Sequence, residues 1–177
     1  MQTTSVHFLS RSNEWQTPPA LFARLHSEFN FTLDPCASHE NHKCEKYFTK
    51  ADDGLSKSWA GERVFMNPPY GREIGHWIEK AYREREALVV CLIPARTDTK
   101  YWHEYCMKAN EIRFISGRVK FGDGCQPAPF PSCLVVFGMG LSNTACSGLV
   151  GTSRLNSVSA PNILSVKVGD LMSPTNR

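Results

Sequence analysis

Four consecutive residues, Asn67-Pro68-Pro69-Tyr70, carry the most specific chemistry in this chain. An Asn amide oxygen, a prolyl carbonyl and an aromatic face at the end of a strand can hold a planar amino group and make it nucleophilic. The alternative is a stiff turn, since two prolines fix φ and remove two N–H donors. Because proline is only about 5% of average usage, such a quartet arises by chance in roughly one chain in a few hundred. We therefore favour the chemical interpretation.

The surrounding sequence predicts the elements that position this quartet. Helical spacing is seen from Thr17, as N-cap with Pro18 in the first turn, and again over residues 74–82 and 98–108. Strands are expected at residues 29–33, 64–66, 87–94, 111–121 and 132–138. This alternation favours an α/β fold with a doubly wound, mostly parallel, Rossmann-like sheet. Ligands of such sheets bind at the carboxyl ends of strands, where Asp34-Pro35 and Asn67-Pro68 fall.

Length and composition predict one domain over residues 1–138. The chain has 177 residues, of which 41% are hydrophobic and 21% charged, as in ordinary globular proteins. All nineteen aromatic residues (10 Phe, 5 Tyr and 4 Trp) precede position 139, so we expect residues 139–177 to form a mostly disordered tail. Within it, the apolar patch at residues 162–166 is the part able to pair weakly.

Location and redox state also follow from the sequence. We see no stretch of about 20 apolar residues that would span a membrane and no signal peptide, which predicts a cytoplasmic protein. Seven scattered cysteines are then expected to be reduced thiols. Cys36, His39, His42 and Cys44 invite a zinc interpretation, but their spacing fits no common zinc pattern, and we expect no metal.

Five landmarks follow one another between residues 14 and 138. They are Glu14-Trp15-Gln16-Thr17-Pro18, Leu33-Asp34-Pro35-Cys36-Ala37, Asp53-Gly54-Leu55 with Trp59, Asn67 to Tyr70 with Gly71-Arg72, and Gly117-Arg118-Val119-Lys120-Phe121 followed by Ala128-Pro129-Phe130-Pro131-Ser132. Together they resemble the phage-type DNA N-6-adenine methyltransferase (Dam) family. The quartet alone is similar to the motif of amino-methyltransferases in general. The resemblance implies a phage- or prophage-encoded enzyme that methylates adenine N6 at specific sites in double-stranded DNA, with S-adenosylmethionine as cofactor.

The resemblance also implies where the cofactor binds. Its candidate residues are Trp15, Thr17, Pro18, Asp34, Pro35 and Asp53. Asp34 would accept a charge-assisted bond from the methionine ammonium; the alternative is an Asp-Pro turn or helix cap. The helix beginning at Pro18 offers N–H groups to a carboxylate, or is simply capped. Asp53 would bind the adenine or ribose, with a solvated turn as the alternative.

Within the quartet, each residue receives a role. Asn67 and the Pro68 carbonyl would accept the two hydrogens of the adenine amine and stabilise the charge that develops on nitrogen. Pro69 would stiffen the turn, and Tyr70 would stack on a base flipped out of the duplex. The proposed chemistry needs no metal and no strong base.

The basic residues are the candidate DNA contacts. Residues 1–138 carry a net charge of only +1, so DNA binding must rest on a local patch. Arg72, Arg118 and Lys120 are predicted to contact phosphates, and ordinary solvated charge is the alternative. Two other classes of function stay open: an RNA or protein-glutamine amino-methyltransferase, and a catalytically silent DNA-binding module.

Overall fold

The computed structural model describes residues 15–122, 124, 126–138 and 163–167. The helices are α1 (Pro19–Phe29), α2 (Ile74–Arg83), α3 (Lys100–Glu104) and the 3-10 turn η1 (Cys106–Lys108). The strands are β1 (Leu33–Asp34), β2 (Lys46–Tyr47), β3 (Arg63–Met66), β4 (Leu88–Pro94), β5 (Glu111–Ile115), β6 (Ser132–Phe137) and β7 (Ile163–Lys167). In this part of the chain, no helix has the length and apolar character that crossing a bilayer requires.

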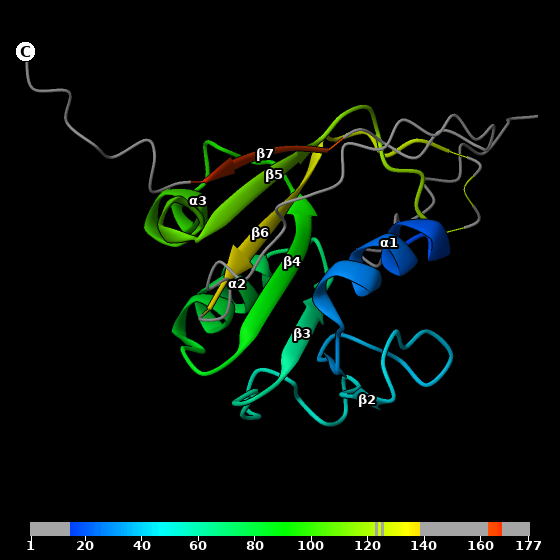
Figure 1. Cartoon of the computed structure of the whole chain (residues 1–177), viewed down its shortest axis with the longest axis vertical. Helices are drawn as coiled ribbons and strands as arrows, with labels where there is room; N and C mark the ends of the chain where they lie inside the picture. The colour runs from blue at the N-terminus through cyan, green and yellow to red at the C-terminus, as the bar shows by residue number, and fades with distance from the viewer. Residues whose placement is uncertain (1–14, 123, 125, 139–162, 168–177) are drawn as a thin grey trace, which may run out of the picture.

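These strands form one mixed sheet in the order β2-β1-β3-β4-β6-β5-β7 (Figure 1). Pairs from β2 through β1 and β3 to β4 are parallel, whereas β6 runs antiparallel to both β4 and β5, and β7 antiparallel to β5. Consequently β1 to β5 share one direction, and only β6 and β7 oppose it. The expected α/β class with a mostly parallel sheet is confirmed.

Helices cover both faces of this sheet. Phe65 of β3 contacts Phe22 of α1, with ring centroids 5.1 Å apart, so α1 lies on the Phe65 face. Val64 precedes Phe65 in β3 and therefore points to the opposite face of the sheet. Val64 is paired with Val89 of β4, and Val89 with Phe137 of β6, so Phe137 also lies on that opposite face. Tyr82 of α2 contacts Phe137 on that second face. Every residue of β4 is buried between the two layers, as its continuous apolar sequence predicts.

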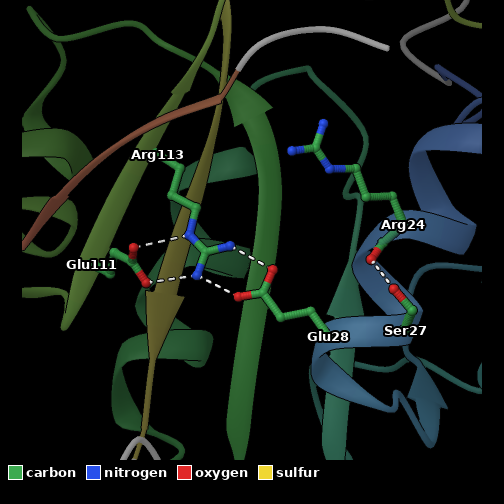
Figure 2. A network of polar contacts seen from close by, with 5 residues as sticks. All are labelled: Arg24, Ser27, Glu28, Glu111 and Arg113. Carbon is green, nitrogen blue, oxygen red and sulfur yellow. Dashed lines mark hydrogen bonds and ion pairs between the residues drawn. The ribbon is translucent and has the colours of Figure 1, made fainter. Parts of the chain in front are cut away.

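An ion-pair network, the Arg113 network, fastens α1 to the antiparallel half of the sheet. Figure 2 shows Arg113 of β5 between Glu111 of the same strand and Glu28 of α1. The guanidinium donates to both carboxylate oxygens of Glu28, at 2.7 and 2.6 Å, and to both of Glu111, at 2.9 and 3.0 Å. It also lies 5.1 Å from the ring centre of Phe29. The network thereby fixes the end of α1 distant from the residue 15–18 segment.

Several predicted element bounds were wrong. Residues 29–33 are not one strand, because α1 continues to Phe29 and ends at Asn30 in the left-handed conformation (φ 49°). The strand predicted over residues 111–121 ends at Ile115, shortly before Gly117 with φ 79°. The predicted helix over residues 98–108 is divided into α3 and η1.

The N-cap of α1 is Pro18, with no side-chain capping bond, so the expected N-cap Thr17 was also wrong. Its hydroxyl is occupied elsewhere, as described below.

The expectation of a disordered tail falls largely outside the described residues. Within residues 139–177 the structure describes only β7, which pairs with β5 as the outer strand of the sheet. This strand overlaps the apolar patch identified from the sequence over residues 163–166. Of the cysteines, Cys36, Cys44, Cys91, Cys106 and Cys133 are free thiols, and Cys125 and Cys146 lie outside the described residues.

Candidate active site

The candidate site lies where the order of the sheet changes direction. From β1 the chain moves outward to β2 and then crosses to β3 on the other side of β1. Such a switch point leaves a crevice at the carboxyl ends of the two strands on either side of it, here β1 and β3. Asp34 is the last residue of β1, and Asn67 directly follows β3. The prediction that both residues lie at strand carboxyl ends is confirmed, and the structure adds that the two strands are neighbours.

A small pocket occupies this crevice. Its lining residues are Thr17, Asp34, Cys36, Asn41, Lys43, Phe65 and Asn67. Three predicted site residues, Thr17, Asp34 and Asn67, therefore meet in one place although they come from separate parts of the sequence. Asn41 and Lys43 are lining residues that sequence reasoning missed.

Asn67 is held by the segment that precedes α1. Its amide nitrogen donates to the carbonyl oxygen of Trp15, at 2.5 Å, and to the hydroxyl of Thr17, at 3.0 Å. Its amide oxygen, Oδ1, is buried and accepts no hydrogen bond from the described residues. Buried polar atoms are nearly always paired, so an unpaired acceptor marks a place where a ligand donor can bind.

Asp34 is a buried carboxylate that also lines the pocket. Only 4% of the residue is exposed, and its two oxygens accept the backbone N–H groups of Cys36 (3.2 Å) and Lys43 (3.0 Å). Burial raises the pKa of Asp34 to about 6, although these bonds and the charge of Lys43 act in the opposite direction. Each oxygen retains lone-pair capacity for a further donor.

The residues that line the pocket fit S-adenosylmethionine. The carboxylate of Asp34 is the one acidic group among the residues that line the pocket. A cationic ligand, such as a sulfonium or an ammonium, would compensate the cost of burying that charge. The backbone N–H groups near Asp34 are already engaged with its own side chain, so they are not free to bind an anion.

Asp53 lies apart from the pocket lining. It is exposed, its φ is 52°, and its carbonyl accepts a hydrogen bond from the hydroxyl of Ser56. The next residue, Gly54, packs directly against the carbonyl oxygen of Pro35. The structure thus brings the 53–55 loop beside the Asp34-Pro35 segment, and a role for Asp53 in cofactor binding stays a prediction.

Tyr70 is enclosed by aromatic rings. Only 5% of the residue is exposed, its hydroxyl donates to the carbonyl of Leu92 at 3.0 Å, and its ring meets Phe121 and Phe130 edge to face. Trp15 contacts the same two phenylalanines. Stacking of Tyr70 on a base stays a prediction, and it requires this aromatic cluster (Trp15, Tyr70, Phe121 and Phe130) to open.

The comparison with protein families decides the assignment. The model of the family "DNA N-6-adenine-methyltransferase (Dam)" matches residues 5–132, which include every candidate site residue. The chain belongs to this Dam family. Members of the family are enzymes that depend on S-adenosylmethionine, and the fold and the recognition made from the sequence are both confirmed.

Individual Dam relatives agree with the family model. A DNA N-6-adenine-methyltransferase of Haemophilus phage HP1 (strain HP1c1) is 30% identical over 148 residues, covering 77% of this chain and 85% of the relative. One of Escherichia phage T1 is 32% identical over 105 residues, covering 57% of this chain but only 44% of the relative. The putative methyltransferase YfdM of Escherichia coli (strain K12) is 35% identical over 66 residues, 33% of this chain and 71% of the relative.

The three basic residues predicted to contact DNA do not line the pocket. Arg72, Arg118 and Lys120 are exposed, with Arg72 just behind the quartet and the other two in the segment after β5. Val119, between them, is buried and its carbonyl accepts the N–H of Ala128, which fixes the backbone there. This placement leaves the two side chains directed to solvent, where DNA contact remains a prediction.

The Cys-His run after Asp34 has partners other than a metal. His39 Nδ1 lies 3.0 Å from the Tyr47 hydroxyl, and His42 Nδ1 donates to the Cys44 carbonyl at 2.9 Å. The His42 ring also stacks on Tyr47, with centroids 4.3 Å apart. Among the residues described, no three His, Cys, Asp or Glu side chains gather as a metal site would require.

Proposed function

We propose that this chain transfers the methyl group of S-adenosylmethionine to the N6 amine of adenine at specific sites in double-stranded DNA. The observation that carries the proposal is the buried, unpaired Oδ1 of Asn67, beside a pocket that also contains the carboxylate of Asp34. Membership of the Dam family and its phage relatives support DNA as the substrate and a phage- or prophage-encoded protein. That such a protein acts in the bacterial cytoplasm is part of the proposal.

Asp34 and the nearby pocket wall would hold the cofactor. S-adenosylmethionine supplies the methyl group on an activated sulfonium. The carboxylate of Asp34 attracts the cationic part of the cofactor, and Thr17, Cys36 and Phe65 bound the same space. Trp15, Pro18, Pro35 and Asp53 do not line this space, and their contact with the cofactor is part of the proposal.

Asn67 and Pro68 would act on the adenine amine. That amine is a poor nucleophile because its lone pair is delocalised into the ring. When Oδ1 of Asn67 and the carbonyl of Pro68 accept its two hydrogens, the nitrogen becomes pyramidal and its lone pair is released for attack. The Asn67 amide is held by its bonds to Trp15 and Thr17 before the reaction, so its Oδ1 would stabilise the positive charge that develops on nitrogen without reorganising. Pro69 stiffens the backbone between them and Tyr70.

The test is methyl transfer from labelled S-adenosylmethionine to a panel of substrates: duplex DNA, RNA and a glutamine-containing peptide. We expect N6-methyladenine in duplex DNA, within a short sequence found by sequencing. The Asn67→Ala variant should keep cofactor affinity while the rate falls by roughly 10²-fold or more, the scale for one preorganised polar group. Transfer only to RNA or peptide would refute the DNA assignment. Cofactor binding without any transfer would instead indicate a silent DNA-binding module.

A further inference from the structure

The orientation of the Asn67 amide is fixed by chemistry on its nitrogen side. The backbone carbonyl of Trp15 can only accept a hydrogen bond, so the group that faces it at 2.5 Å must be the NH₂ of Asn67. The second hydrogen of that NH₂ goes to the hydroxyl of Thr17 at 3.0 Å. Rotating the amide by half a turn would place two oxygens against each other. Oδ1 is therefore turned away from residues 15–17.

The residues that hold the amide are themselves held. Residues 15–17, which we call the strap, are anchored by a hydrogen bond from the N–H of Gly122 to the carbonyl of Gln16, at 2.8 Å. The ring of Trp15 packs edge to face against Phe121 and Phe130, with centroids 5.5 and 5.1 Å away. The strap is thus clamped between the body of the sheet and the segment after β5.

Of the two groups that accept from the Asn67 NH₂, only the Thr17 hydroxyl belongs to a side chain and can be removed by substitution. Only 2% of the residue is exposed, so water cannot replace its hydroxyl as the acceptor for Asn67. The hydroxyl does not cap α1, because the N-cap is Pro18 and no side-chain capping bond forms. Its bond to Asn67 spans fifty positions in sequence, which a local structural role would not require.

We propose that Thr17 is a positioning residue, which holds the Asn67 amide with Oδ1 free to accept from the adenine amine. This role rests on the proposed function, and it differs from the contact with the cofactor that the sequence suggests for Thr17. A positioning residue changes the rate of the chemical step, whereas a cofactor contact changes the affinity for S-adenosylmethionine.

Steady-state kinetics of Thr17→Val and Thr17→Ser separate the two roles. Valine keeps the shape of threonine and removes the acceptor, so kcat should fall by about threefold to tenfold, with the KM for S-adenosylmethionine unchanged. Serine retains the hydroxyl and should restore kcat. Thr32→Val is the matched control, because Thr32 bonds Glu62 at the opposite end of β1 and should leave kcat unaltered. A raised KM with unchanged kcat would overturn the proposal.

A second measurement does not depend on activity. In the ¹⁵N-labelled wild-type protein, the side-chain NH₂ of Asn67 should exchange slowly with solvent, and Thr17→Ser should preserve that protection while Thr17→Val reduces it. Rapid exchange in the wild type would refute the positioning role, even where Thr17→Val fails to fold. If the wild type shows the protection but methylates nothing, the proposed function fails while the geometry of the strap stands.

Discussion

Gly54 lies so close to the carbonyl oxygen of Pro35 that a Cβ atom on residue 54 would be 2.4 Å from that oxygen. Its own carbonyl accepts a hydrogen bond from the indole of the buried Trp59, at 3.0 Å. The 53–55 loop is therefore locked between Trp59 and the Asp34-Pro35 segment. One contact is with a backbone oxygen and the other with a fully buried ring, so the loop can move only if the backbone of Pro35 or the ring of Trp59 moves as well.

Gly54→Ala should therefore destabilise the protein by about 1–3 kcal/mol, the range for overpacking a tight contact. Urea unfolding followed by tryptophan fluorescence measures this loss. Gly75→Ala is the matched control: Gly75 lies in α2, where an added Cβ meets only an ordinary contact with Tyr101 at 3.8 Å, and alanine favours the helix. Equal stability of the Gly54 variant and the wild type would show that the loop relaxes freely.

Cofactor binding should depend on pH through Asp34. Its pKa in the free protein is about 6, and a bound cation lowers that pKa because it favours the carboxylate. Affinity is then full above about pH 7 and falls as the pH drops through 6, by up to about tenfold per unit. Calorimetric titration with S-adenosylmethionine between pH 5 and 7 measures this dependence.

Asp34→Asn should bind more weakly, by about 1.5–3 kcal/mol at pH 7, and lose the pH dependence. Asp98→Asn, at an exposed position between β4 and α3, serves as the control that retains it. A wild-type affinity that stays constant from pH 5 to 7 would remove Asp34 from the cofactor site.

Substitutions at Arg113 and at Glu28 should lower the free energy of unfolding by unequal amounts. Arg113→Met leaves the carboxylates of Glu28 and Glu111 facing the same space without their guanidinium, which should cost about 3–5 kcal/mol. Glu28→Gln should cost about 1 kcal/mol or less. The Glu28 side chain is 45% exposed, so water can take the place of its carboxylate beside Arg113. Urea denaturation of both variants decides the point, and similar losses would contradict the proposed asymmetry.

Contacts with DNA phosphates should make the affinity for DNA depend on the salt concentration. If Arg118 and Lys120 contact phosphates, each change to alanine weakens binding to all sequences alike and reduces the slope of log K against log salt by about 1. Fluorescence anisotropy at several salt concentrations gives the slope. Arg83→Ala, at the end of α2 that leads into the amino end of β4, is the control. An unchanged slope for Arg118→Ala and Lys120→Ala would make both residues ordinary surface charge.

Sequence patterns predicted the parts of this protein that depend on local composition. The apolar run at residues 87–94 agrees with β4 to within one residue, since a strand buried on both faces needs no polar positions. The position of Asp34 and Asn67 at carboxyl ends of strands, where ligands of parallel sheets bind, was also predicted correctly. By contrast, the end of α1 was missed although it has a local signal, because Asn30 adopts the left-handed conformation that asparagine tolerates at the end of a helix.

The missed parts of the site are those made by distant backbone groups. The bond from the backbone of Lys43 to Asp34 and the bonds from Asn67 to the strap join segments that no periodicity relates. The one sequence signal for the strap was the Trp-x-Thr-Pro pattern at residues 15–18, which indicates that Thr17 matters but not for which partner. Only the folded geometry distinguishes a contact with Asn67 from a contact with the cofactor.

The position of β7 has a consequence for how molecules of this protein behave in concentrated solution. β5 would be the last strand of the sheet without β7, and it carries Phe114, which is 40% exposed. An uncovered strand with free N–H and C=O groups pairs readily with the same strand of another molecule. A chain ending at Gly138 retains every candidate site residue, and we expect it to fold and to methylate, yet to self-associate as its concentration rises. Light scattering across a dilution series would reveal that association, and a monodisperse shortened chain would show that β5 needs no cover.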